Sequence, residues 1–136
     1  MDAIKQYMQP KLVLTGVGIL FTIFTLLTYA GVVNAAETGW GADYDDRDVF
    51  YEKAWSATFL LVAIITIVSG QFVEGRAQAI LAITIGGGNI FIFILTLLAA
   101  GDLGYGYTDS PANWAIPMIC ATCMLVSGFL HLEEGE

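Results

Sequence analysis

Two cysteines are the side chains of this sequence most able to carry redox chemistry. Cys120 and Cys123 form a Cys-x-x-Cys pair, a spacing that is redox-active in thioredoxin-like proteins. Membrane thiol oxidoreductases also place such a pair in a helix, but they generally relay electrons to a second pair, and this chain has no further cysteine. We therefore interpret the pair as ordinary small buried thiols and keep redox catalysis as the alternative.

Other candidate chemistry is sparse. His131 is the only histidine, which makes a poor metal site and excludes bis-histidine haem ligation. Asp43, Asp45 and Asp46 are spaced loosely like a calcium loop, but the turn glycine and the later glutamate of that motif are absent, so a weak surface cation site is the alternative to a solvated loop. Without a nucleophile–base pair, phosphate loop or metal cluster, the sequence predicts no catalytic residue, no metal site and no independent enzyme.

The elements that must position these side chains are four stretches without Asp, Glu, Lys or Arg, at residues 12–34, 54–73, 77–100 and 114–132. Each has roughly the ~20 apolar residues that a helix needs to cross a bilayer. The chain is 57% hydrophobic and only 13% charged, against about 25% charged in soluble domains. The sequence predicts an all-α integral membrane protein, a single membrane domain with a bundle of four transmembrane helices.

The connections between these spans differ in length and charge. Glu74-Gly75-Arg76 is so short that we expect the second and third spans to be antiparallel neighbours. The acidic segment 36–53 is the longest connection, and we expect a partly structured loop on the outer membrane surface. Basic residues favour the cytoplasmic side. The side that carries the termini has three basic residues, Lys5, Lys11 and Arg76, and the other side has two, Arg47 and Lys53. This difference predicts that both termini lie in the cytoplasm.

Aromatic residues gather on the side of the longer connections. Amphipathic rings favour the membrane interface. We therefore expect an interface belt made of Trp40, Trp55, Tyr105, Tyr107 and Trp114.

An internal repeat relates the two halves of the chain. The segment 39–41 (Gly-Trp-Gly) is echoed by 104–106 (Gly-Tyr-Gly), and 68–70 (Val-Ser-Gly) is echoed by 126–128. The repeat predicts two similar helical hairpins of the same orientation. Some transporters use such parallel repeats, and a duplicated hairpin without a transport role is the alternative.

Small residues mark the faces expected to pack. In lipid they let helix backbones approach closely. The predicted helix-packing residues are Gly16, Gly18, Ala82, Gly86, Gly87, Gly88 and Asn89. Further small-xxx-small pairs are Gly31 with Ala35 and Cys123 with Ser127. For the triplet 86–88 the alternative is a bend that opens a cavity, and for Asn89 it is a pore lining in place of a hydrogen bond between helices.

Charge restricts the partners. The formal net charge is −8, which excludes the clustered basic residues that nucleic acid requires. The apolar spans make the lipid bilayer the main partner, and no Asp, Glu, Lys or Arg lies within them to form a proton or ion relay. An apolar cofactor such as a lipid or pigment binds without a sequence signature, so the sequence names none.

The first hairpin resembles the YiaA/YiaB two-helix family of bacterial inner-membrane proteins. The resemblance rests on 31–35 (Gly-Val-Val-Asn-Ala) and 52–55 (Glu-Lys-Ala-Trp), followed by Gln71 and Arg76, and it covers about a third of the chain. The second hairpin departs from it, with Gly101-Asp102 and no Glu-Lys pair, and the acidic loop is extra. The resemblance implies an inner-membrane location and no known activity.

The function expected from these features is that of a non-catalytic structural or accessory subunit in a bacterial or archaeal inner membrane. It would pack against copies of itself or against larger membrane-protein subunits. The alternative is a small oligomeric channel or transporter whose pore is lined by Asn89 and threonines.

Overall fold

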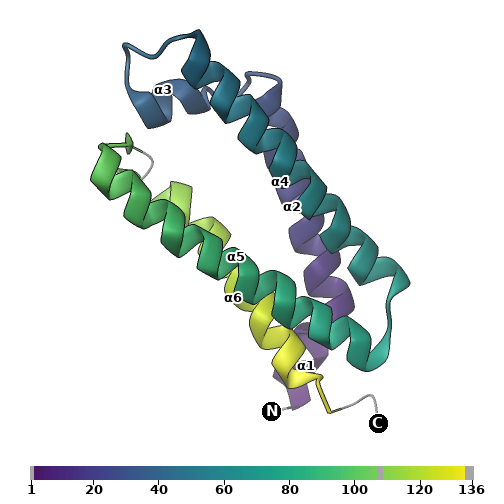
Figure 1. Ribbon diagram of the computed structural model, residues 1–136. Helices are drawn as coiled ribbons and strands as arrows, with labels where there is room; N and C mark the ends of the chain where they lie inside the picture. Colours follow the sequence, from purple (N-terminus) through teal and green to yellow (C-terminus); the bar gives the residue numbers. More distant parts are fainter. Residues whose placement is uncertain (1, 107–108, 134–136) are drawn as a thin grey trace.

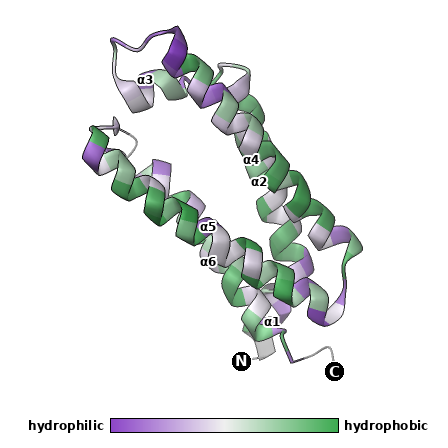
Figure 2. Ribbon diagram, viewed as in Figure 1, coloured by the Kyte–Doolittle hydropathy of each residue, from purple (hydrophilic) through white to green (hydrophobic). Residues whose placement is uncertain are grey.

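The computed structural model describes residues 2–106 and 109–133, and all regular structure in this part of the chain is helical (Figure 1). The helices are α1 (Asp2–Tyr7), α2 (Pro10–Tyr29), α3 (Ala35–Trp40), α4 (Asp46–Phe72), α5 (Gly75–Leu103) and α6 (Pro111–Leu130). Within the described residues, four helices, α2, α4, α5 and α6, are long and apolar enough to cross a membrane. Apolar residues run along them, and polar ones gather at their ends (Figure 2). The chain is an all-α integral membrane protein, as predicted.

The four long helices pack as two pairs that form a V. Helix α2 packs along α4 and helix α5 packs along α6, while contacts between the pairs are far fewer. The pairs meet near α1 and the α4–α5 turn and diverge toward α3 (Figure 1). We call these the closed end and the open end of the V. The repeat relationship of the two pairs stays a prediction.

Reciprocal glycines hold α2 against α4. A Cβ on Gly18 of α2 would lie 2.6 Å from Cγ1 of Ile67, and a Cβ on Gly70 of α4 would lie 2.6 Å from Oγ1 of Thr15. Each helix therefore lacks a side chain where the other approaches, which permits close packing in lipid. The pairing of residue 18 with 67 and of 15 with 70 makes the helices antiparallel.

Reciprocal glycines also lie at the contact between α5 and α6. A Cβ on Gly86 would lie 2.5 Å from the backbone nitrogen of Leu125, and a Cβ on Gly128 would lie 2.5 Å from the carbonyl oxygen of Ala79. Both approaches are to backbone atoms, which cannot move aside as a flexible side chain can. These two glycines therefore set the separation of the second pair.

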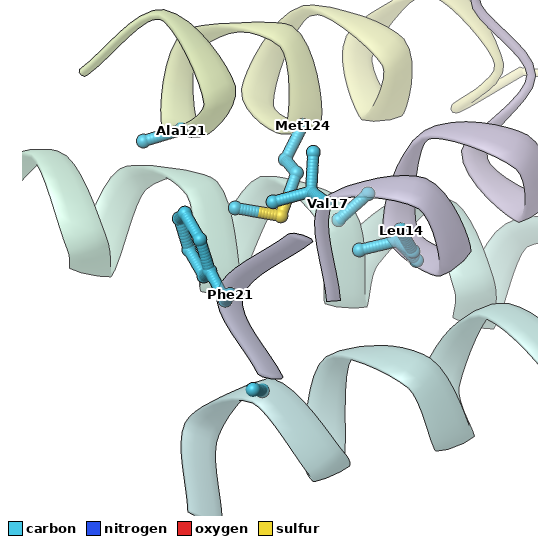
Figure 3. Packing of buried hydrophobic residues seen from close by; sticks show 7 residues of the cluster. Leu14, Val17, Phe21, Ala121 and Met124 are labelled. Carbon is cyan, nitrogen blue, oxygen red and sulfur yellow. The ribbon is translucent and has the colours of Figure 1, made fainter. Parts of the chain in front are cut away.

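The apolar core lies toward the closed end, where the pairs meet. It contains Leu14, Val17 and Phe21 of α2 and Ala121 and Met124 of α6 (Figure 3). Met124 extends from α6 toward the α2 side chains in this view. The core is completed by alanines of the other two long helices, Ala63 and Ala82.

The buried side-chain amide of Gln78 joins α5 to the end of α4 at the turn between them. Nε2 of Gln78 donates to the carbonyl oxygens of Ser69, at 3.2 Å, and Gly70, at 3.0 Å. The prediction that the second and third spans are neighbours therefore holds near this turn and not along their length. The small residues of α4 face α2 and those of α5 face α6, so the two helices separate beyond the turn.

The helix boundaries correct those predicted from charge. Helix α2 ends at Tyr29, before residue 34, because Gly31 turns the chain with a φ of 76°. Helix α4 begins at Asp46, so residues 46–53 are helical and do not belong to a surface loop. The Asp45 carboxylate accepts from the backbone N–H of Arg47 and Asp48, and the Asp48 side chain accepts from Asp45 N–H, which forms a capping box.

Candidate binding cleft

A cleft of about 780 Å³ lies between the two helix pairs at the open end of the V. Residues of α2, α3, α4, α5 and α6 line it, together with Tyr105 from the segment after α5. Its volume falls within the roughly 300–1,000 Å³ typical of small-molecule sites. The wall is mostly apolar and aromatic, with a few polar groups. Such a composition suits an apolar or amphiphilic ligand.

Aromatic rings form the floor of the cleft, between the cavity and the core. The ring centroid of Phe59 lies 6.4 Å from that of Phe21 and 6.1 Å from that of Phe93. The Trp55 ring is 5.2 Å from Phe59 on the outer side. Phe59 of α4 thus connects α2 and α5 at the depth where the pairs begin to diverge.

The outer end of the cleft is built around the carboxylate of Glu52. The Tyr105 hydroxyl donates to Glu52 Oε1 at 2.5 Å, and the Trp40 indole Nε1–H donates to the same oxygen at 3.2 Å. The two rings also contact each other, with centroids 4.9 Å apart at 65°. Glu52 is half-buried, and no described residue donates a hydrogen bond to its second oxygen, Oε2. One carboxylate oxygen is therefore left for a ligand.

Local sequence places these three residues. Asn34 caps α3, since its side chain accepts from Glu37 N–H at 3.2 Å, and this cap orients the helix that carries Trp40. Gly104 ends α5 in the left-handed region with a φ of 68°, and Tyr105 N–H then bonds the carbonyl oxygen of Ala100 at 2.9 Å. The turn directs Tyr105 back toward α3.

Gly39 and Gly106 leave the space in which the Tyr105 segment packs beside α3. A Cβ on Gly39 would lie well inside contact distance of the Tyr105 ring. A Cβ on Gly106 would lie 3.0 Å from the carbonyl oxygen of Thr38. The ring of Tyr105 therefore occupies space that any side chain at position 39 would fill.

The predicted helix-packing residues differ in burial. Gly18, Ala82 and Gly86 are buried in the helix contacts and the core. Gly16 and Gly88 face outward, and a Cβ on either would meet nothing within 4 Å. Gly87 is intermediate, its added Cβ lying 3.7 Å from Cδ1 of Leu125.

The other small pairs do not all form helix seams. Gly31 lies in the turn after α2 and Ala35 opens α3, so these two do not share a helix face. Cys123 is half-buried and Ser127 is fully buried in α6.

Asn89 is buried near the middle of α5 but does not line the cleft. Its Nδ2 donates to the carbonyl oxygen of Ile85 at 2.8 Å, within its own helix. That bond does not join two helices. Helix α5 also continues unbroken through the glycine triplet 86–88, and Gly86 is used for the contact with α6.

Threonine hydroxyls likewise bond their own helices. Thr22, Thr28, Thr58, Thr66, Thr84, Thr96 and Thr122 each donate to the carbonyl oxygen four residues earlier. Of the described threonines, Thr25, Thr28, Thr38, Thr58 and Thr96 line the cleft. The hydroxyls of Thr28, Thr38, Thr58 and Thr96 add polarity to this wall while donating to carbonyl oxygens four residues earlier.

The predicted interface belt lies mainly in the cleft. Trp40, Trp55 and Tyr105 line it, whereas Trp114 is half-buried on α6 outside the lining. Tyr107 lies outside the described residues. Three of the five predicted belt residues therefore face a cavity between the helix pairs, and their place at a membrane interface stays a prediction.

The residues considered for redox and metal chemistry lie apart from the cleft. Cys120 and Cys123 are free and half-buried, and Cys120 packs against the core. His131 Nδ1 lies 3.0 Å from the carbonyl oxygen of Ser127. In the described residues, no group of three or more His, Cys, Asp or Glu side chains could hold a metal ion.

Glu52 is the residue that sequence reasoning missed. In the sequence it is one of the acids of the segment 36–53, which ends just before a charge-free stretch. The Asp45-x-x-Asp48 spacing was the signal that could have found it, because a capping box there extends the helix outward past position 52. Glu52 and Trp55 then lie about one turn apart on one helix, facing the same cavity.

Comparisons of the chain with protein-family models, curated proteins and solved structures gave no match. The resemblance of the first hairpin to the YiaA/YiaB family therefore stays a prediction.

Proposed function

We propose that this chain is a non-catalytic structural or accessory subunit of a membrane, which assembles with copies of itself or packs on larger membrane-protein subunits. The observation that carries the proposal is the outward face of α5. Thr84 and Gly88 are both exposed there, and they are four residues apart. Such a small-xxx-small pair allows another transmembrane helix to approach closely.

The chemistry of this face suits association in lipid. A Cβ on Gly88 would meet no atom of the described residues within 4 Å, so this position is open to a neighbouring helix. The Thr84 hydroxyl donates to the carbonyl oxygen of Ile80 at 2.9 Å and needs no water. By contrast, the Ala82–Gly86 pair on the same helix is used within the molecule, against α6.

The test is the effect of Gly88→Leu on assembly in lipid nanodiscs, measured by native mass spectrometry and by co-purification from membranes. The wild type should form oligomers or retain a larger partner, and Gly88→Leu should lose that association. Gly16→Leu is the matched control, since Gly16 is also outward-facing and unobstructed, but on α2. A wild-type protein that is monomeric and without a protein partner would refute the proposal.

We place the protein in a bacterial or archaeal inner membrane with both termini in the cytoplasm. The excess of Lys5, Lys11 and Arg76 over Arg47 and Lys53 supports this orientation. The start of α1 and the end of α6 lie at the closed end of the V, which fits termini on one side (Figure 1). Reporter fusions at the two ends should both be cytoplasmic, and opposite compartments would contradict this topology.

A small oligomeric channel or transporter is the second candidate, and the threonines in the cleft wall favour it. Thr25, Thr28 and Thr96 provide a polar path that the predicted pore residue Asn89 does not join. Proteoliposomes should then show flux that Thr96→Leu reduces and that Thr122→Leu, on an exposed face of α6, leaves unchanged. An absence of flux over a broad ion panel would remove this candidate.

A further inference from the structure

We propose that the cleft at the open end of the V binds an amphiphilic cation, with its positive head beside Glu52 and its apolar body above the Phe59 floor. This site is independent of the association face on α5. The inference rests on three features of the same cavity: one carboxylate, the aromatic rings around it, and an apolar interior.

The carboxylate supplies the charge preference. Glu52 is half-buried, and its described hydrogen bonds come from two neutral donors, Trp40 and Tyr105, on a single oxygen. Neutral donors compensate a carboxylate for lost water only in part, and a cation compensates it more fully. Oε2 accepts from no described residue, so a positive head can approach it without displacing the existing bonds.

The rings supply a second preference for a cation. Trp40, Tyr51, Trp55 and Tyr105 line the same cavity as Glu52. The faces of tryptophan and tyrosine attract positive charge, and aromatic cages of this composition recognise alkylammonium groups. An anionic ligand would meet the carboxylate and the negative ring faces together.

The interior supplies a place for an apolar body. Beyond the head site the lining is mostly apolar and includes Phe21, Phe24, Phe59, Phe93 and Ala99. The Thr28 and Thr96 hydroxyls in the same wall donate to carbonyl oxygens of their own helices. The cavity of about 780 Å³ is large enough for a drug-sized molecule. A phospholipid is a poorer occupant, because its phosphate would lie near Glu52.

Charge on the outer face also favours cations. Acidic residues outnumber basic ones between residues 36 and 53, six to two, and Asp102 at the end of α5 and Asp109 before α6 add two more acids. A surface of one sign raises the local concentration of the opposite ion. The acidic surface at the open end therefore raises the local concentration of cations, the ligands that the cleft is proposed to bind.

The test is equilibrium binding of radiolabelled tetraphenylphosphonium to the purified full chain in nanodiscs. Tetraphenylborate has the same shape with the opposite charge and serves as the matched ligand control. Saturable binding of the cation, without comparable binding of the anion, is expected. No saturable cation binding, or equal affinity for the two ions, would overturn the proposal.

The variant that tests the head site is Glu52→Gln, which keeps the side-chain shape and can still accept from Trp40 and Tyr105. It should weaken cation binding by about tenfold or more, because a charge-assisted contact becomes neutral. Glu37→Gln removes one outer charge from a residue that does not line the cleft, and it should change affinity less than twofold, roughly the scale of a screened surface charge. Equal effects of the two variants would show only a general surface-charge effect and would refute the site.

A second variant keeps the proposal testable if Glu52→Gln fails to fold. Thr96→Trp places a large ring into the cavity wall and should abolish cation binding, whereas Thr122→Trp on the exposed face of α6 should not. Retained binding in a folded Thr96→Trp protein would place the ligand elsewhere and overturn the proposal. Oligomer mass measured on the same samples separates this result from the proposed assembly function.

Discussion

Trp40 and Tyr105 meet edge to face across the open end of the V, with ring centroids 4.9 Å apart, and donate hydrogen bonds to the same oxygen of Glu52. Each ring is the middle residue of a Gly-aromatic-Gly segment. The two segments follow different helix pairs, so their contact links the pairs at the end where the long helices diverge.

Tyr105→Phe tests the strength of this link. The change removes the hydroxyl that donates to Glu52 but keeps the ring against Trp40. We expect the free energy of unfolding to fall by roughly 1.5–2 kcal/mol, the lower part of the range for a hydrogen bond to a charged group, because the site is half-buried. Thermal unfolding in a mild detergent measures it. Tyr29→Phe at the exposed end of α2 is the control, and an equal loss there would contradict a specific role for the Tyr105 hydroxyl.

Gly39→Ala tests whether stability depends on the close contact between α3 and the Tyr105 ring. The added methyl group would overlap the Tyr105 ring, so the ring or α3 must shift. We expect a loss of roughly 1–3 kcal/mol, typical of overpacking. The near-ultraviolet circular dichroism of the aromatic residues should also change. Gly101→Ala, where the methyl group meets open space on α5, should leave the spectrum unchanged. A wild-type spectrum and stability for Gly39→Ala would show that the contact is not required.

Gly128→Ala tests the close packing of α5 and α6. A Cβ there would lie 2.5 Å from the carbonyl oxygen of Ala79, so the two backbones must move apart. Overpacking of this kind costs roughly 1–3 kcal/mol. Gly16→Ala on the open face of α2 should not destabilise the protein and should stabilise it by roughly 0.5–1 kcal/mol, because alanine favours the helix more than glycine does. Unfolding in detergent that is identical for the two variants would argue against glycine-set helix separation.

The spans were predictable because charge is absent over about 20 residues at a time, and that signal does not depend on tertiary contacts. The rotation of each helix about its own axis, which decides the face that is buried, was not predictable. A helix that is apolar on all sides carries no pattern that distinguishes its buried face from its lipid-facing face. Gly16 and Gly18 therefore looked equivalent, although Gly18 touches α4 and Gly16 faces outward.

The cleft could not be predicted from the sequence, for a different reason. Its walls come from two helix pairs whose relative angle depends on the core around Leu14 and Met124 and on the Gln78 amide at the α4–α5 turn. No local pattern specifies that angle. Sequence reasoning could place the aromatic residues at one end of the spans, but it could not predict that Trp40, Trp55 and Tyr105 would surround a cavity with Glu52.

Phe59→Ala tests the floor that separates this cavity from the core. The Phe59 ring contacts the rings of Phe21 and Phe93, so its removal takes away an aromatic connection between α2, α4 and α5. Fully buried Phe→Ala changes cost about 3–5 kcal/mol, and we expect roughly 2–3 kcal/mol because Phe59 is half-buried. Phe72→Ala, at the exposed end of the same helix, is the matched control and should change thermal stability by less than about 0.5 kcal/mol. If Phe59→Ala unfolds at the wild-type temperature, the floor does not hold the pairs together, and the angle of the V must then be set by the core and the α4–α5 turn alone.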